Sequence, residues 1–195
     1  DILIYKSNLV PVGEDQLPHI DLTNEILKKI NSMFGRTFEP VKAHLAPGAR
    51  IMSLQEPEKK MSKTGDEGIA LTDSPDEIRE KIKKAVTDSG KEIKFDEKNK
   101  PAISNLMTIY ALLNPKIKNL KQIENQYEGK TYVEFKNDMT EVIIEFLKPF
   151  QKKYDKFKNN LSEVEKILED SEEKARKEAQ KTLGEVKQKI GVLSR

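Results

Sequence analysis

Residues 2–12 read Ile-Leu-Ile-Tyr-Lys-Ser-Asn-Leu-Val-Pro-Val, and the fold class is decided in this stretch. It contains two short β-prone runs, 2–5 and 9–12, separated by a turn-like Lys-Ser-Asn. Short apolar runs bounded by turn residues are typical of strands, so both runs are predicted to be extended.

A helical pattern and a further strand-rich stretch follow. Apolar residues recur close to helical spacing from about 18 to 34. Gly35 is a suitable stop, because glycine accepts the left-handed backbone that ends helices. Residues 41–54 are again rich in strand formers around a Pro-Gly turn. This strand–helix–strand order predicts an α/β layer with a parallel sheet.

After residue 73 the pattern is helical throughout. Ser74 and Glu77 have the spacing of a capping box, and Pro75 stands at the first helical position. Ser89-Gly90 is expected to end that helix. Five apolar stripes are predicted to pack as a helical bundle. They are Ile78, Ile82, Ala85, Val86; Ile103, Leu106, Met107, Ile109, Tyr110, Leu113; Val133, Phe135, Met139, Val142, Ile143, Phe146, Leu147; Phe150, Tyr154, Phe157, Leu161, Val164, Leu168; and Ala175, Ala179, Leu183, Val186, Ile190.

The composition restricts the classes of function. Among 195 residues, 35 are basic and 33 acidic, so a nucleic-acid partner would have to meet a local basic surface. Cysteine is absent, which excludes disulfides and thiolate metal sites and fits a cytoplasmic location. No stretch approaches the ~18 apolar residues of a membrane span. Because the chain begins with Asp1 in a strand-like stretch, we expect an N-terminal part of a longer protein to precede it.

The stretch Lys60-Met61-Ser62-Lys63-Thr64 carries the main chemical signal. Two ammonium groups three residues apart could stabilise the negative charge that builds on a departing pyrophosphate. Gly65 and Gly68 would let such a loop open and close. The alternative interpretation is a solvated loop in a lysine-rich chain.

A second candidate segment is Val12-Gly13-Glu14-Asp15-Gln16. Gly13 could let a ligand approach the backbone, Asp15 could accept hydrogen bonds from ribose hydroxyls, and Gln16 could bind a small polar group. Alternatively, Asp15 simply caps the next helix. Both candidate segments would follow the carboxyl ends of strands, where parallel sheets bind ligands.

Other kinds of site find no support in the sequence. His19 and His44 are assigned structural or surface roles, and no histidine–carboxylate cluster has metal-ligand spacing. Neither a GxxxxGK[ST] loop nor a GxGxxG loop occurs. A Ser/His/Asp nucleophile arrangement is not readable either.

Taken together, these motifs resemble one family, the bacterial tryptophanyl-tRNA synthetases of class I. The resemblance covers the chain to about residue 113. It is carried by Asp1–Tyr5, Val10–Gln16, His19, Ala49–Leu54, Lys60–Thr64, Ala85–Ser89 and Lys100–Leu106. The fifth of these is similar to the second class I signature, usually Lys-Met-Ser-Lys-Ser, with Thr64 in place of the last serine.

The resemblance implies a tryptophan site. In it, Asp1 accepts the indole N–H, and Val10 and Val12 line the indole pocket. Gln16 holds the α-amino or carboxylate end of the amino acid.

The resemblance also implies an ATP site and its reaction. Gly13 and Asp15 contact the ribose, while Met52 and Met61 lie near the adenine. Lys60, Ser62 and Lys63 meet the phosphates, with the two lysines as catalytic residues. Mg²⁺ arrives with the nucleotide, and no protein metal site is implied. ATP-dependent formation of tryptophanyl-adenylate would precede transfer to tRNA(Trp).

The first class I signature, His-Ile-Gly-His or a variant, does not occur in the sequence. The chain is therefore expected to be a C-terminal portion with a partial Rossmann-like α/β fold followed by an all-α bundle. Residues 1–72 would be the C-terminal half of the catalytic domain, and 73–195 the helical anticodon-binding domain. The resemblance further implies a homodimer formed through the N-terminal half, and little activity of this segment alone.

Two alternatives stay open at this point. One is a tyrosine-type class I synthetase, against which Asp1, Val10 and Val12 argue. The other is a non-catalytic helical RNA-binding module with a vestigial nucleotide fold.

Overall fold

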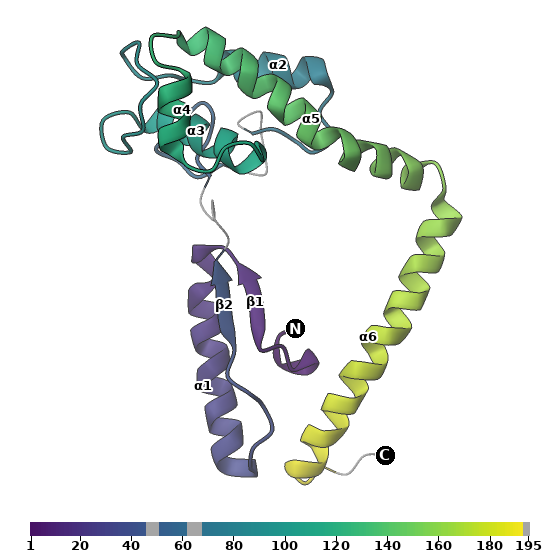
Figure 1. Cartoon of the computed structure of the whole chain (residues 1–195). Helices are drawn as coiled ribbons and strands as arrows, with labels where there is room; N and C mark the ends of the chain where they lie inside the picture. The colour runs from purple at the N-terminus through teal and green to yellow at the C-terminus, as the bar shows by residue number, and fades with distance from the viewer. Residues whose placement is uncertain (46–50, 62–67, 193–195) are drawn as a thin grey trace. The chain divides into compact units, whose positions relative to one another are not determined.

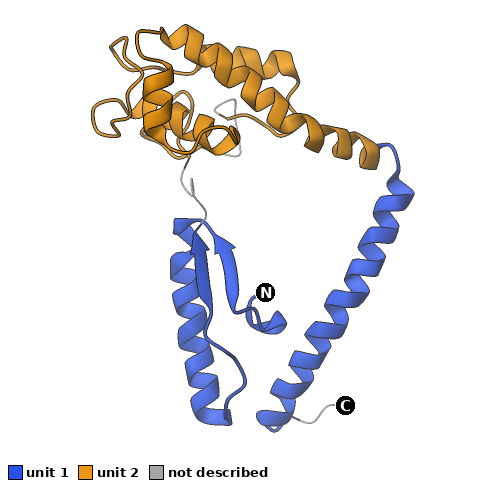
Figure 2. Cartoon of the chain, viewed as in Figure 1, with its two compact units in different colours: residues 1–49, 159–195 blue, residues 50–158 orange. Residues whose placement is uncertain are grey.

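A computed structural model describes residues 1–45, 51–61 and 68–192 of the chain. The described chain divides into two compact units (Figure 2). Unit 1 comprises residues 1–49 and 159–195, and unit 2 comprises residues 50–158. This division differs from the predicted boundary at residue 72, because the segment before that boundary already belongs to unit 2.

Unit 1 contains a parallel strand pair joined by a helix (Figure 1). β1 (Leu9–Val12) pairs with β2 (Lys42–Leu45), and Leu9 stands opposite Lys42. The connection is η2 (Glu14–Gln16) and α1 (Leu17–Phe34). The predicted strand–helix–strand order and the parallel sheet are therefore confirmed.

Apolar packing and two asparagines hold α1 against the return segment. Ile20 and Leu27 of α1 are buried with Phe38 and Val41. The Asn24 side chain bonds both backbone groups of Val41, accepting from its N–H and donating to its carbonyl at 2.9 Å each. As predicted, α1 ends at Gly35, whose φ of 80° lies in the left-handed region. Asn31 bonds the loop that follows, accepting from the N–H groups of residues 37 and 38 and donating to the carbonyl of residue 38.

Two of the predicted strands are wrong. Leu3–Tyr5 forms the 3₁₀ turn η1, which Lys6 closes with a positive φ of 49° and a hydrogen bond to the Leu3 carbonyl. Its backbone groups are satisfied locally, which overrides the β-propensity of the side chains. Residues 51–54 form only an isolated bridge, because this segment doubles back on residues 59–61. Residues 46–50 lie outside the described ranges.

Unit 2 is helical in its described part. Its elements are α2 (Pro75–Lys84), α3 (Pro101–Leu113), α4 (Leu120–Gln126) and α5 (Tyr132–Lys158). The predicted capping box of α2 is confirmed by both of its hydrogen bonds, one in each direction between Ser74 and Glu77. The helix ends at Lys84 and not at Ser89-Gly90. Just after the helix end, the Lys136 ammonium donates to the Ala85 carbonyl at 2.5 Å. Val86, which was predicted to belong to the apolar stripe, is 44% exposed.

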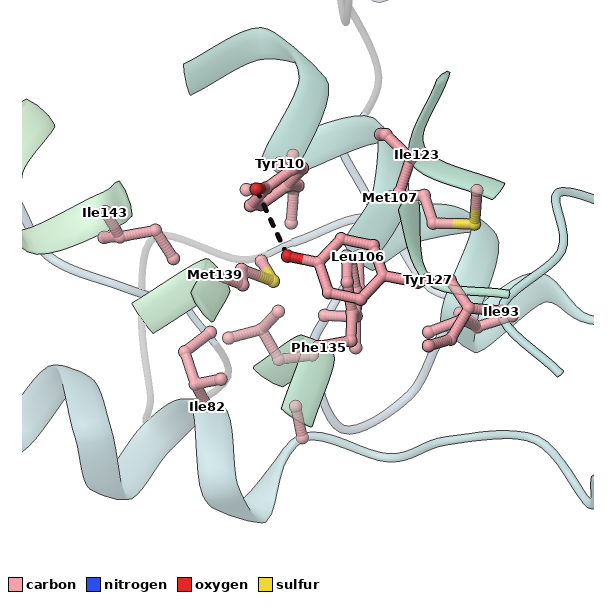
Figure 3. Packing of buried hydrophobic residues seen from close by; sticks show 14 of the residues in the cluster. Ile82, Ile93, Leu106, Met107, Tyr110, Ile123, Tyr127, Phe135, Met139 and Ile143 are labelled. Carbon is pink, nitrogen blue, oxygen red and sulfur yellow. Dashed lines mark hydrogen bonds between the residues drawn. The ribbon is translucent and has the colours of Figure 1, made fainter. Parts of the chain in front are cut away.

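Aromatic rings from α3, from α5 and from the residue that ends α4 form the centre of the unit 2 core (Figure 3). Phe135 is fully buried, and its ring centroid lies 5.0 Å from that of Tyr127 and 5.4 Å from that of Tyr110. The Tyr127 hydroxyl donates to a carboxylate oxygen of Asp138 at 2.8 Å and lies 3.3 Å from the Tyr110 hydroxyl. Burial, followed by these two neighbours, raises the pKa of Tyr127.

The last helix, α6 (Leu161–Lys189), belongs to unit 1. Its residue Val186 packs against the unit 1 core, Glu185 pairs with Lys6 at 2.5 Å, and Lys189 donates to the Arg36 carbonyl at 2.7 Å. The expectation that its apolar stripe joins the other helices in one bundle is therefore wrong. The predicted stripe 150–168 is also interrupted, since α5 ends at Lys158 and Asn160 caps α6.

Within the described ranges, no helix combines the length and the apolar character needed to cross a membrane. The fold class expected from the sequence, a partial Rossmann-like α/β fold with a helical domain, is confirmed, although α6 belongs to unit 1 and not to the predicted bundle.

Candidate functional site

The residues predicted to bind substrates fall into two groups. Unit 1 contains those predicted for tryptophan and ribose: Asp1, Val10, Val12, Gly13, Asp15 and Gln16. Unit 2 contains Met52, Lys60 and Met61. Ser62 and Lys63 lie outside the described residues, as do Thr64 and Gly65.

The first group follows the carboxyl end of β1. Val12 is the last residue of the strand, and Gly13 continues it with extended angles (φ −77°, ψ 163°). The chain then turns into η2, which exposes Asp15 and Gln16. The Gln16 amide donates to the Asp15 carboxylate at 3.1 Å. This is the position at which parallel α/β folds offer polar groups to ligands.

Asp1 lies at a cavity of about 510 Å³ in unit 1. Its mainly apolar wall comes from the N-terminal segment with η1, from α1, from the loop after α1 and from α6: Ile2, Leu3, Ile4, Thr23, Phe38, Thr182, Leu183 and Val186 line it together with Asp1. Val10 and Val12 do not line this cavity; both are half-buried against the unit 1 core.

The second group lies on a small hairpin at the start of unit 2. Met52 pairs with Lys60 in an antiparallel bridge. Two backbone hydrogen bonds flank it, from Ser53 N–H to the Lys59 carbonyl at 2.8 Å and from Met61 N–H to the Ile51 carbonyl at 3.0 Å. The hairpin presents Lys60 to solvent and turns Met61 towards the unit 2 core. It thus fixes the backbone immediately before the lysine-rich signature.

The turn of this hairpin is held by Ser53. Its side chain is fully buried, and its hydroxyl accepts from the N–H groups of Gln55 and Glu56 at 3.2 and 3.1 Å. Lys59 forms an ion pair with Glu56 at 2.5 Å. A buried hydroxyl that bonds two turn amides fixes the turn without help from a regular sheet.

Sequence reasoning assigned no role to three side chains that support this region. Asn105 of α3 bonds both backbone groups of Met52. Gln151 of α5 donates to the carbonyls of Leu71 and Asp73 at 3.1 and 2.9 Å. Lys81 of α2 pairs with the Asp73 carboxylate at 2.8 Å. For Asn105 the sequence offered two signals: it lies in the Lys100–Leu106 segment of the family resemblance, and it is a polar residue between two positions of an apolar stripe, which indicates a buried side chain in need of partners.

Along the described ranges, no group of three or more His, Asp or Glu side chains gathers as a metal site. The chemistry that the described residues can supply is charge and hydrogen bonding: an exposed ammonium at Lys60, carboxylates at Asp1 and Asp15, and an amide at Gln16.

Comparisons with known proteins agree on one family. The sequence-family model for the class I tRNA synthetases of tryptophan and tyrosine matches residues 1–148. A tryptophan–tRNA ligase of Bacillus anthracis is 42% identical over 98% of this chain and 59% of its own length. One from Caldanaerobacter subterraneus is 43% identical over 100% of this chain and 60% of its own length.

Solved structures give the same result. The tryptophanyl-tRNA synthetase of Mycoplasma pneumoniae aligns with a TM-score of 0.82 at 30% identity, covering 99% of this chain and 60% of that protein. The enzyme of Campylobacter jejuni, solved with ADP and tryptophan, aligns with a TM-score of 0.71 at 29% identity, covering 98% and 59%. The chain thus spans about three fifths of the length of these relatives. It belongs to the family of class I tRNA synthetases for tryptophan and tyrosine.

Proposed function

We propose that this chain is the C-terminal portion of a tryptophan–tRNA ligase. One observation supports the proposal most: the lysine-rich signature begins at Lys60, which a hairpin holds opposite Met52. The chain that carries this signature is 42% identical to a tryptophan–tRNA ligase. The position of Gly13, Asp15 and Gln16 after the carboxyl end of β1 adds support. A relative at 29% identity was solved with ADP and tryptophan, which are of the same chemical classes as the proposed substrates.

The proposed reaction has two steps. A carboxylate oxygen of tryptophan attacks the α-phosphorus of ATP, and the bond from that phosphorus to the bridging oxygen breaks. Tryptophanyl-adenylate forms and pyrophosphate leaves with the released electron pair. A hydroxyl at the 3′ end of tRNA(Trp) then attacks the activated carbonyl carbon and displaces AMP. Such catalysis depends mainly on positioning and on stabilising charge.

Each predicted residue has a role in this proposal. Lys60 and Lys63 bind the β- and γ-phosphates and stabilise the charge that develops on pyrophosphate. Asp1 accepts the indole N–H in a charge-assisted hydrogen bond, which would favour tryptophan over other aromatic amino acids. Val10 and Val12 contact the indole, and Gln16 holds the polar end of the amino acid.

The remaining contacts of the proposal concern the nucleotide. Gly13 and Asp15 contact the ribose, Met52 and Met61 lie near the adenine, and Ser62 adds a hydroxyl near the phosphates. Mg²⁺ enters with ATP, bound to its phosphates. In relatives of this length, residues beyond the aligned three fifths would supply the rest of the site.

The larger-scale features are part of the same proposal. Residues 1–72 would contribute to the catalytic domain and 73–195 to the anticodon-binding domain. The whole protein would be a cytoplasmic homodimer. Because the first class I signature does not occur in these 195 residues, the isolated chain should have little activity.

Amino-acid-dependent exchange of pyrophosphate into ATP tests the proposed function. The longer protein that carries this chain should exchange with tryptophan and not with tyrosine. Exchange driven by tyrosine would instead establish the tyrosine-type alternative, and a protein that binds no ATP would establish the non-catalytic one. Near-native exchange by the isolated 195-residue chain would refute the expectation that it lacks half of the ATP site.

A further inference from the structure

The Asn105 side chain joins helix α3 to the hairpin that carries Lys60. Its carboxamide oxygen accepts from Met52 N–H at 3.0 Å, and its nitrogen donates to the Met52 carbonyl at 2.8 Å. Asn105 is 8% exposed, and the two partners are 53 positions apart in sequence. One buried amide thus satisfies both backbone groups of a single residue, and its removal would leave both without that partner.

Met52 stands directly opposite Lys60, so its position bears on that lysine. The bridge between them is closed by the backbone bonds that join Ser53 to Lys59 and Met61 to Ile51. Each bond joins a residue next to Met52 to a residue next to Lys60. A shift of the Met52 backbone should therefore also shift the Lys60 backbone.

The chain on the far side of the signature is held by unit 2 as well. Gln151 of α5 binds the carbonyls of Leu71 and Asp73. The Asp73 carboxylate accepts from Ala70 N–H at 2.8 Å and from Lys81. Because that anchor does not depend on α3, loss of Asn105 should displace the hairpin side of the signature selectively.

We propose that Asn105 is a positioning residue for Lys60. Its two hydrogen bonds to the Met52 backbone fix the position of the Met52–Lys60 hairpin relative to α3. This proposal rests on the proposed function, in which Lys60 meets the phosphates of ATP. Asn105 touches neither substrate. Its effect on adenylate formation passes through Met52 and the hairpin.

Unit 1 supplies a matched control. Asn24 makes the same pair of bonds to both backbone groups of Val41, at 2.9 Å each. Asn105→Ala and Asn24→Ala therefore remove the same chemical group and the same number of backbone bonds. Only the first of the two changes lies next to the lysine-bearing hairpin.

The test compares both variants in the longer protein that carries this chain, by tryptophan-dependent exchange and by thermal unfolding. Since small misplacements of reacting groups are costly, Asn105→Ala should lower kcat about tenfold or more. The KM for tryptophan should stay within about twofold, because the proposed tryptophan ligands Asp1 and Gln16 belong to unit 1. Asn24→Ala should lose similar thermal stability and keep kcat within about twofold of wild type.

Amide hydrogen exchange on the 195-residue chain provides a second measurement that does not depend on catalysis. The Met52 amide should be protected in the wild type and exchange about tenfold faster in Asn105→Ala, while the Val41 amide is unchanged. Rapid exchange of Met52 in the wild type would overturn the proposal even if the variant failed to fold.

The outcomes separate this inference from the proposed function. If the wild-type longer protein shows no tryptophan-dependent exchange, the proposed function fails and the inference fails with it. If the wild type is active and Asn105→Ala keeps its kcat, or loses no more than Asn24→Ala, only the positioning role is overturned.

Discussion

Truncation of Phe135 should weaken unit 2 more than most other single changes would. Its side chain is fully buried, with ring centroids 5.0 and 5.4 Å from those of Tyr127 and Tyr110. Phe135→Ala removes this apolar surface and leaves a cavity among rigid rings, a change that typically costs about 3–5 kcal/mol. The Phe135–Tyr127 pair is edge-to-face, with 85° between the ring planes, and accounts for about 0.5–1.5 kcal/mol of that loss, while the Tyr110 ring is tilted by 57°.

The matched control lies on the same helix. Phe146 is 50% exposed, so its replacement by alanine should cost about 1 kcal/mol, because roughly half of its apolar surface is already in water. The two variants delete the same atoms from α5 and differ mainly in burial. The difference between them isolates the contribution of the core position.

Urea unfolding of the 195-residue chain at 25 °C measures both changes. The chain has no tryptophan, so tyrosine fluorescence can follow the core beside far-UV circular dichroism. Relative to wild type, the urea concentration at the unfolding midpoint should fall far more for Phe135→Ala than for Phe146→Ala. The dependence of the unfolding free energy on urea concentration should be the same in both variants. Free energies of unfolding that agree within about 1 kcal/mol for the two variants would refute the packing argument.

Three further changes test local features. Burial raises the pKa of Tyr127, so this residue stabilises the fold fully below its ordinary pKa of 10.0 and less as pH rises above it. As pH rises from 10 to 11.5, the free energy of unfolding measured with urea should therefore fall less for Tyr127→Phe than for wild type. An equal fall in both proteins would contradict this. The Phe95 N–H lowers the pKa of Glu124 below 4.5, so its stabilisation is present above that pH and lost as pH falls through the folded pKa. Acid unfolding of Glu124→Gln should show a shallower pH dependence below 4.5, whereas an unchanged profile would contradict that hydrogen bond's role. Ser74→Ala removes the α2 cap and should lower the free energy of unfolding by about 1 kcal/mol in urea, whereas an unchanged free energy would contradict the role of the cap.

Local sequence patterns predicted the elements whose partners are near in the chain. The helix that ends at Gly35, the strand pair around it and the capping box at Ser74 all follow from spacing and turn chemistry over fewer than forty residues. Such signals depend on backbone preference and amphipathic periodicity, which a single sequence displays directly.

Features that depend on distant partners were not predictable in this way. Residues 2–5 are a local exception, because they are β-prone and yet hydrogen bonds within residues 2–7 close a 3₁₀ turn. The apolar stripe of α6 specifies a buried face without specifying its partner, which proves to be the unit 1 core near Val186. The partner of Asn105 could not be predicted, because the backbone groups of Met52 lie 53 positions away in the sequence.

For the candidate site, the sequence predicted residue types and local placement. The polar residues after β1 lie where that pattern suggested, whereas Lys60 stands opposite Met52 in an antiparallel hairpin and does not follow the carboxyl end of a strand of the parallel sheet. The hairpin that positions Lys60, and the side chains of α3 and α5 that hold it, follow only from three-dimensional contacts. A resemblance to a family identifies reacting groups more readily than the residues that support them.

The most direct test of the central claim is single-turnover formation of tryptophanyl-adenylate by rapid quench. The longer protein should be compared with its Lys60→Ala and Lys63→Ala variants, and tryptophan affinity measured in parallel. Loss of a group that stabilises developing charge should slow the chemical step about 100-fold or more and leave the tryptophan Kd nearly unchanged. An adenylate rate equal to that of wild type in both variants would contradict the account.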